Sequence, residues 1–437
     1  MLRTISLVLL GLLSACGTTA SATPPLLLDH VTVINGRGGA PLPDRAVLVQ
    51  GGRIVSVGPS GAAPIPADAR RIDLRGRFLV PGLIDSHVHL KSRPREAGSV
   101  ELILANLFLG SGVTTVRDMG GNGAELAPLR IAAEAERANS PRILLSSLFT
   151  GPRSTFWMTG DQANYVAGNA APGSPPWIRH IASGEGIEDA VRQARQWGAA
   201  GIKVHSGFTA DELAQLGAAA RRNRLLLWTH GMVGPARPGD AVRAGAASIS
   251  HADMLAYEGL TAPPPGFEAL SYRERTQVAM RATPVEGPVL GQLFRLMRER
   301  GTCLEPTLLV MSPNEPAAQL NDYVAYAAAA TARAHREGVA ICAGTDVIRG
   351  RRASLLDELA LLVRHAGLTP MDAIRAATLN NARALGLADR GVIAPGMAAD
   401  LVVLTRDPTQ DIGNLASVEA VILAGAYRPA PAAPGDD

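Results

Sequence analysis

This chain of 437 residues has little net charge and few cysteines, and each of these features argues against a class of protein. The formal net charge is only +3 and no dense lysine or arginine tract occurs, which argues against nucleic acid or acidic lipid as a partner. Three cysteines are too few for a disulfide framework. The remaining composition, 47% hydrophobic and 19% charged, is ordinary for a globular enzyme.

The N-terminus has the layout of a bacterial secretory signal. In MLRTISLVLLGLLSAC one basic residue precedes an apolar stretch that is too short to remain as a transmembrane helix. LSAC resembles a lipobox, which implies that Cys16 is lipidated, and Gly17 then favours the outer membrane. The alternative is an ordinary signal that is cleaved after ASA (residues 20–22). We therefore expect residues 1–22 to be signal and tether, and the protein to be exported across the inner membrane and anchored by lipid on the periplasmic side of the outer membrane.

The two other cysteines, Cys303 and Cys342, lie in apolar, strand-like runs. An exported protein can form a disulfide between them. The sequence alone favours two buried free thiols.

Residues 81–390 alternate short apolar runs with amphipathic helical patterns. Eight runs qualify as strands, and near-continuous apolar strands between helices indicate a parallel sheet that is buried on both faces. Eight such units match the size of a (β/α)8 TIM-like barrel in the α/β class. A doubly wound open sheet is the alternative, because it gives the same order of elements.

The two ends of the chain differ from this pattern. Residues 23–80 and 391–428 are β-branched runs separated by Gly, Pro and Asp turns. Neither is expected to form a good core alone, so we predict that they join in one small β-sandwich beside the barrel. Residues 429–437 are expected to be a disordered tail.

Polar residues stand at the ends of several predicted barrel strands. In a barrel these ends meet at one mouth, where such enzymes have their active sites. Alone, each residue has an ordinary explanation: a hydrogen-bonded histidine, a salt-bridged lysine, a helix-capping aspartate. Together they form a set of nitrogen and oxygen donors that suits a zinc-like ion. The set is His87, His89, Lys203, His230, His251 and Asp346.

The motifs around these residues resemble those of the amidohydrolase superfamily, in the same order along the chain. They are VPGLIDSHVHL, GVTTVRDMG, GIKVHSGF, LLLWTH, ASISHAD, ICAGTDV and TLNNARALGLADRGVIAPGMAADLVVL. The resemblance covers nearly the whole mature chain and is greatest to the imidazolonepropionase-like branch, which includes prolidase-like Xaa-Pro and Xaa-Arg dipeptidases. It is specific for the superfamily and much less so for the substrate.

The resemblance implies two divalent metal ions, most simply Zn²⁺. His87, His89 and Asp346 would bind one ion, His230 and His251 the other, and a carboxylated Lys203 would bridge them. The chemistry agrees, because an ammonium group cannot bind a cation and Lys203 is useful there only if it is neutral or carboxylated. Paired ions can activate a hydroxide and polarise a carbonyl. Asp346 would then serve as the catalytic general acid/base.

The chain departs from its prolidase-like relatives in places. They carry a TGGH-like loop after the third strand, where this chain has FTGPRSTFWMTG, and they often have IEH where this chain has ISH. These differences leave the metal ligands intact and put dipeptide specificity in doubt.

Two loops supply candidate substrate-binding residues. The loop after the third strand is rich in aromatic residues and is a candidate lining for an apolar acyl group, or else packs onto the barrel. An arginine after the eighth strand is a candidate clamp for a substrate carboxylate, or else a solvated loop charge. The candidates are Arg153, Trp157, Tyr165 and Arg349.

Together these features predict a metal-dependent hydrolase that cleaves an amide C–N bond of a small molecule, a dipeptide or an N-acyl amino acid. A lactonase or phosphotriesterase remains an alternative because related metal centres cleave those bonds. A non-catalytic envelope lipoprotein that retains the fold is the third hypothesis. The sequence makes no prediction about oligomeric state.

Overall fold

The structure is a computed structural model that describes residues 24–62, 64–90, 110–121, 123–136, 139–154, 178–181, 186–312, 321–346 and 355–430. The predicted signal with its lipidation site Cys16 lies outside this range, as does most of the predicted tail. Within the described residues, no helix combines the length and apolarity that crossing a membrane requires.

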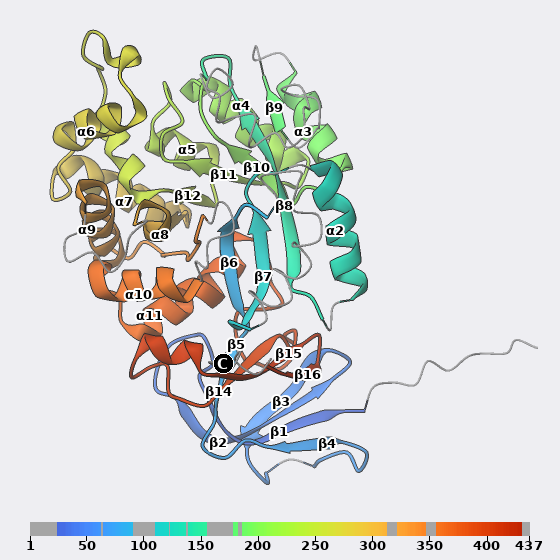
Figure 1. The fold of residues 1–437 in the computed structure, drawn as a ribbon. Coiled ribbons are helices and arrows are strands. Elements are labelled where there is room, and N and C mark those ends of the chain that lie inside the picture. Colours follow the sequence, from blue (N-terminus) through green and yellow to red (C-terminus); the bar gives the residue numbers. More distant parts are fainter. Residues whose placement is uncertain are drawn as a thin grey trace, which may run out of the picture.

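A parallel sheet forms the centre of the molecule (Figure 1). Seven strands neighbour one another in chain order, and each corresponds to one of the predicted apolar runs. A short strand, β9 (Ile178–His180), pairs alongside the third of them. The seven are β6 (Leu83–Val88), β7 (Val113–Asp118), β8 (Arg142–Thr150), β10 (Gly201–Val204), β11 (Leu226–His230), β12 (Ser248–Ser250) and β13 (Cys303–Glu305).

The eighth predicted run closes the ring without forming a regular strand. An isolated parallel bridge joins Ile341 to Leu304 of β13. On the other side, the Asp346 N–H donates to the His87 carbonyl at 2.7 Å. The eighth run therefore lies between the first and last strands, which makes the sheet a closed barrel rather than an open sheet.

Helices surround this sheet on the outside (Figure 1). Their faces toward the sheet carry much of the main apolar core. They are α2 (Gly123–Ala135), α3 (Ile187–Gln196), α4 (Ala210–Arg222), α5 (Pro238–Ala244), α6 (Tyr272–Ala282), α7 (Pro288–Arg300), α8 (Leu308–Met311), α9 (Asp322–Arg336), α10 (Leu355–Ala366), α11 (Pro370–Arg375) and α12 (Asn381–Ala384).

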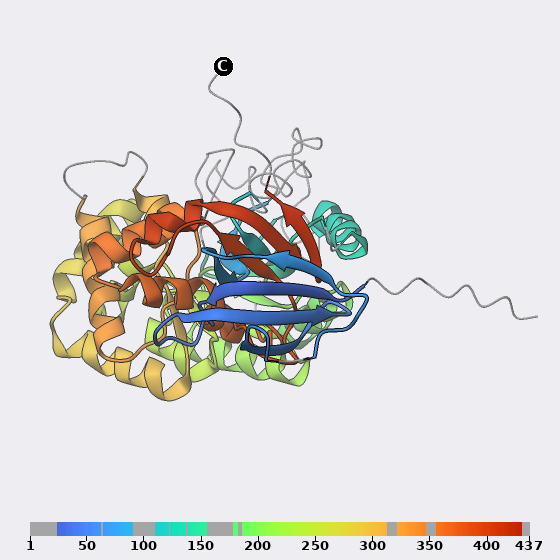
Figure 2. The same cartoon turned by 90° about the horizontal axis from the view of Figure 1, so that it is seen from below.

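The two ends of the chain build a second sheet, in which Figure 2 shows the first strands in blue beside the last strands in red. Its order is β16-β15-β14-β5-β1-β2-β3, with β4 paired to β1. The predicted sandwich is thus one continuous hydrogen-bonded sheet with a common apolar core. The strands are β1 (Leu26–Val33), β2 (Leu42–Gln50), β3 (Arg53–Pro59), β4 (Arg70–Asp73), β5 (Phe78–Pro81), β14 (Leu401–Leu404), β15 (Val418–Leu423) and β16 (Ala426–Pro429).

The two sheets meet where β5 runs directly into β6. Gly82, between them, has no room for a side chain, because a Cβ atom there would lie 2.2 Å from Thr114 Oγ1. The start of the first barrel strand therefore packs closely against β7.

The prediction of two free thiols is wrong. Cys303 and Cys342 form a disulfide, and both residues are buried. The two cysteines are 39 residues apart in the sequence, and nothing in the sequence indicates how far apart they lie in space. Parallel pairing at the barrel closure brings their Cα atoms to 6.0 Å. The bond joins β13 to the irregular eighth run, where backbone pairing is sparse.

Removing this bond is expected to destabilise the protein substantially. Closing a 39-residue loop removes chain entropy from the unfolded state, which corresponds to about 4 kcal/mol in the loop-entropy treatment. The double variant Cys303→Ala/Cys342→Ala should therefore unfold at a clearly lower denaturant midpoint than the wild type. An unchanged midpoint, with the wild-type disulfide verified by thiol titration, would contradict this stabilising role.

Candidate metal centre

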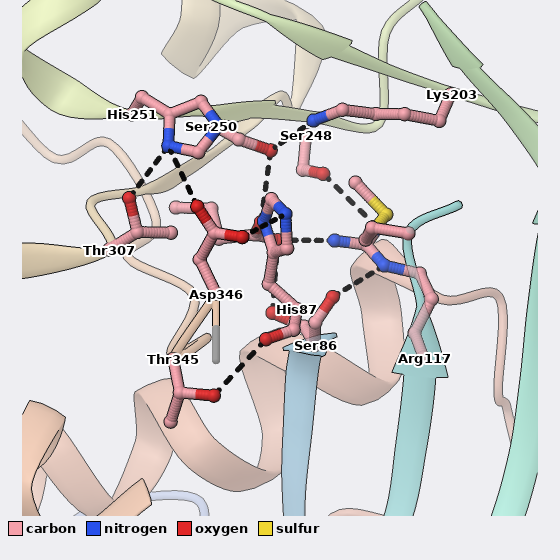
Figure 3. Close-up of polar contacts among 12 residues, drawn as sticks. Ser86, His87, Arg117, Lys203, Ser248, Ser250, His251, Thr307, Thr345 and Asp346 are labelled. Atoms are coloured by element: carbon pink, nitrogen blue, oxygen red, sulfur yellow. Dashed lines mark hydrogen bonds and ion pairs between the residues drawn. The ribbon is translucent and has the colours of Figure 1, made fainter. Parts of the chain in front are cut away.

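The six residues predicted to form the site come together in one cavity of about 260 Å³ at the carboxyl ends of the barrel strands. Figure 3 shows several of them pointing toward one another from different strands. Parallel strands make this convergence possible, because their carboxyl ends meet at one mouth. The cavity is lined by His87, His89, Met119, Leu148, Lys203, His205, His230, His251, Asp253, Met254, Val310, Met311 and Asp346.

His87, His89 and Asp346 form the tightest group of donors. The Nε2 atoms of His87 and His89 lie 3.4 and 3.1 Å from Asp346 Oδ1. One ligand atom from each residue falls within 4.8 Å of the others. That spacing suits a single ion bound at about 2.0–2.2 Å from nitrogen and oxygen ligands.

Hydrogen bonds at Nδ1 orient both histidine rings, while their Nε2 atoms lie near Asp346. His87 Nδ1 lies 2.5 Å from Glu305 Oε1, and His89 Nδ1 lies 3.0 Å from the Gly120 carbonyl. A carbonyl can only accept, so His89 carries its proton on Nδ1, and the Glu305 carboxylate favours the same tautomer for His87. The Nε2 atoms of both rings therefore face Asp346, an arrangement common in metal-binding histidines.

Asp85 fixes the backbone that carries two of these donors. Its Oδ1 accepts from the N–H groups of His87 and Thr345, each at 3.1 Å, and its Oδ2 accepts from Thr345 Oγ1 at 2.8 Å. Burial raises the pKa of Asp85 to about 7 in spite of these donors. Gly344 completes the close packing, since a Cβ atom there would lie 2.6 Å from the His87 Cβ.

Three further imidazoles continue from this group across the cavity. The His205 and His230 rings lie 4.3 Å apart between centroids, and the His230 and His251 rings 4.6 Å apart. Burial lowers the pKa of His205 and of His251 to about 3 and that of His230 well below its usual value, so all three are neutral at neutral pH. His230 Nδ1 is buried without a hydrogen-bond partner among the described residues. A neutral ring with an orphaned nitrogen suits a metal ligand.

Lys203 lies on the cavity floor, almost fully buried. Its Nζ donates to Ser250 Oγ at 2.9 Å, and Ser250 Oγ donates in turn to Glu305 Oε1 at 2.9 Å (Figure 3). Burial lowers the pKa of Lys203 to about 7, although the negative charge of Glu305 partly opposes this shift. The neutral amine, which is the form able to react or bind a cation, is therefore accessible near neutral pH.

Backbone conformation also marks this site. His251, Thr307 and Asp346 have positive φ angles of 71°, 52° and 51°. Residues other than glycine rarely adopt this conformation, and where they do so they often serve a functional site. His251 follows β12, Thr307 follows β13 and Asp346 ends the irregular eighth run; His251 and Asp346 line the cavity, and Thr307 contacts His251.

The sequence interpretation missed three residues of the site. His205 lies two residues after Lys203, so strand periodicity could have placed it on the same face. Glu305 ends β13 inside an apolar run, and the rule that strand ends converge would have found it. Asp253, two residues after His251, also lines the cavity.

The predicted substrate-binding residues are not brought into the described cavity. Arg153 is half-exposed and pairs through Nη1 with Glu212 Oε2 at 2.8 Å. It is not among the described residues that line the cavity. Trp157, Tyr165 and Arg349 lie outside the described residues. The described wall is instead apolar, formed by Met119, Leu148, Met254, Val310 and Met311.

The fold and the site together are those of a barrel enzyme with histidine and carboxylate donors at the carboxyl ends of its strands. The sequence profile of the Amidohydrolase family matches residues 78–427. The chain therefore belongs to the amidohydrolase family, and it is a hydrolase that acts on carbon–nitrogen bonds.

Known proteins agree with this assignment. The chain is 28% identical to an imidazolonepropionase from Cereibacter sphaeroides over 409 residues, which cover 83% of this chain and 88% of the relative. It is similar in structure to a putative prolidase from Bifidobacterium longum, with a TM-score of 0.70, 26% identity and coverage of 94% and 96% of the two chains. A Xaa-Pro dipeptidase with bound methionine shares the fold, with a TM-score of 0.72 at 22% identity over 93% of this chain and 100% of that one.

Proposed function

We propose that this protein is a metal-dependent amidohydrolase that cleaves the amide bond of a dipeptide or N-acyl amino acid with an apolar side chain. One observation carries the proposal: all six residues chosen from strand ends lie in a single cavity. The family assignment supports hydrolysis at a carbon–nitrogen bond. The relatives support an amide substrate without identifying it.

The donors fit two divalent ions. His87, His89 and Asp346 would hold one, and His230 and His251, with the orphaned His230 Nδ1, would hold the second. A carboxylated Lys203 would lie between them. When bound, such ions polarise a carbonyl and lower the pKa of water. Nitrogen and oxygen ligands of this kind suit Zn²⁺, which we propose as the metal.

The protein's own residues would then orient the substrate and move one proton. Asp346 Oδ1 faces the two Nε2 atoms, whereas its Oδ2 lies on the side of His251, 3.8 Å from Nδ1. Oδ2 is thus the atom placed to accept the proton of the attacking water and return it to the leaving nitrogen. Burial opposes ionisation of Asp346, but the surrounding imidazoles, His87 first, hold its pKa well below the usual range.

The apolar wall supports the choice of substrate. Met119 after β7, Leu148 near the end of β8 and Met254 in the helical turn after β12 line the same space as Val310 and Met311. Flexible methionine side chains adapt to apolar groups of different shapes. An apolar side chain or acyl group next to the scissile amide would bury surface against this wall.

The lysine content of the chain allows a sharp test. The sequence contains only two lysines, Lys91 and Lys203, whereas arginine supplies every other strong base. A guanidinium does not lose its proton in proteins, but a buried amine does, so a lysine is needed where a neutral nitrogen must react. In protein equilibrated with ¹³C-bicarbonate, we expect one carbamate signal in the NMR spectrum. It should be absent from Lys203→Ala and retained in Lys91→Arg.

The same variants test the activity. Zinc-loaded protein should cleave a subset of mixed dipeptides and N-acyl amino acids, with products identified by mass spectrometry. Lys203→Ala should lose this cleavage and Lys91→Arg should keep it. Cleavage of lactones or phosphotriesters alone would replace the amide assignment, and no cleavage of any of these by folded, metal-loaded protein would favour a binding role.

We also propose export and a lipid anchor at Cys16. The buried Cys303–Cys342 disulfide supports export, because such bonds form and persist in oxidising compartments. Metabolic labelling with a fatty-acid analogue should mark the wild type and leave Cys16→Ala unlabelled.

A further inference from the structure

The segment Thr307–Met311, which follows β13, contacts the site in two ways. Thr307 Oγ1 lies 2.8 Å from Nδ1 of His251 (Figure 3). Three and four residues later, Val310 and Met311 form part of the apolar wall of the cavity. The position of this one segment therefore bears on a metal-site histidine and on the space left for the substrate.

Glu358 of α10 binds the backbone of this segment from outside the cavity. This side chain is fully buried and does not line the cavity. Its Oε1 accepts from the Leu308 N–H at 3.0 Å, and its Oε2 accepts from the Leu309 N–H at 2.7 Å. These amides begin the short helix α8, where N–H groups have no partner within the helix.

We propose that Glu358 is a positioning residue of the active site, which holds Thr307–Met311 so that Thr307 orients His251 and Met311 limits the substrate cavity. The part concerning substrate rests on the proposed amide cleavage, whereas the part concerning His251 rests only on the proposed metal site. Glu358 touches neither reacting atoms nor the cavity, so it acts only through the segment.

The geometry explains why the segment needs such an anchor. Thr307 has a φ angle of 52°, a conformation that its β-branched side chain does not favour. Two hydrogen bonds from one rigid carboxyl group to the next two amides fix the chain just after this turn. When Nδ1 of His251 donates to the Thr307 hydroxyl, the lone pair of Nε2 is left for a ligand.

The first test compares Glu358→Gln with Glu299→Gln, which changes an exposed helical carboxylate. Burial raises the pKa of Glu358 to about 8, but even a protonated carboxyl group can accept at both oxygens. Glutamine instead presents an NH₂ group to one of the two backbone donors. We expect Glu358→Gln to weaken metal binding about tenfold, as loss of a supporting hydrogen bond typically does. Glu299→Gln should bind metal as the wild type does.

The metal affinity is measured by chelator competition and metal analysis without substrate, so it decides the proposal even if the protein hydrolyses no amide. With an active enzyme, Glu358→Gln should also raise KM most for substrates with the largest apolar groups, a selectivity that general destabilisation would not produce. Wild-type metal affinity and wild-type relative KM values in folded Glu358→Gln would overturn the proposal.

A second pair of variants keeps the test decisive if Glu358→Gln fails to fold. Thr307→Val removes the hydroxyl at nearly constant shape, and Thr307→Ser keeps it. We expect Thr307→Val to weaken metal binding and Thr307→Ser to restore it to near the wild-type value. Equal metal affinities for the two variants would show that the segment does not act through His251.

Discussion

Asp346→Asn is expected to lower kcat by about 10²–10⁴-fold, the range that general acid–base catalysis contributes. The amide keeps the shape of the side chain but cannot take up a proton from water at neutral pH. It also removes the negative charge that faces His87 Nε2 and His89 Nε2 at 3.4 and 3.1 Å. Turnover and metal content should be measured on the same preparation.

The two roles of Asp346 can be separated. Loss of turnover with full metal content would assign Asp346 chiefly to proton transfer, whereas loss of both would assign it chiefly to metal binding. Asp68→Asn, which changes an exposed aspartate between β3 and β4 of the terminal sheet, serves as the matched control and should behave as wild type. Unchanged turnover in Asp346→Asn would show that another group moves the proton and would contradict the proposed mechanism.

Strand order was the part of this structure most accessible from sequence. The apolar runs that end in His87, His230 and His251 each form a strand, and parallel pairing brings those ends to one mouth. The prediction therefore needed only the positions of the strands and the identity of the residue at each end. The six candidate donors line one cavity because a parallel barrel brings the ends of its strands to one mouth.

The contacts that support the donors and close the barrel could not be predicted from strand positions. Glu305 bonds to His87, which is 218 residues away in sequence, and Cys303 bonds to Cys342 across the barrel closure. Nothing local in the sequence encodes such distances. For Glu305 the available signals were its place at a strand end and its charge within an apolar run, because a buried carboxylate requires partners.

Loop residues were hardest to place, and Arg153 shows why. Its place in the aromatic-rich loop after the third strand made Arg153 a candidate substrate-binding residue, but Arg153 pairs with Glu212, whose carboxylate also accepts from the Thr209 N–H at the start of α4. The direction of a loop side chain depends on which neighbouring element offers a partner. Strand periodicity gives no information on that choice.

Glu305→Gln is expected to be the most destabilising single change at the site. Glu305 is fully buried and accepts from Ser86, from Ser250 and from the guanidinium of Arg117. Burial would raise the pKa of Glu305, but Arg117 and then His87 hold it well below its usual range. Removing its charge leaves buried Arg117 without a counter-ion, and breaking a buried ion pair in this way costs about 3–5 kcal/mol. Urea unfolding of metal-free protein measures this loss.

The same change should weaken metal binding about 10–100-fold, because His87 loses the carboxylate that fixes its tautomer. A double variant separates the two effects. Arg117→Met/Glu305→Gln removes both charges, and the methionine still packs near Trp228, whose ring lies 4.5 Å from the Arg117 guanidinium carbon. We expect the double variant to regain stability while metal affinity stays low. Recovery of metal affinity together with stability would show that Glu305 supports the fold alone and that His87 does not depend on its carboxylate.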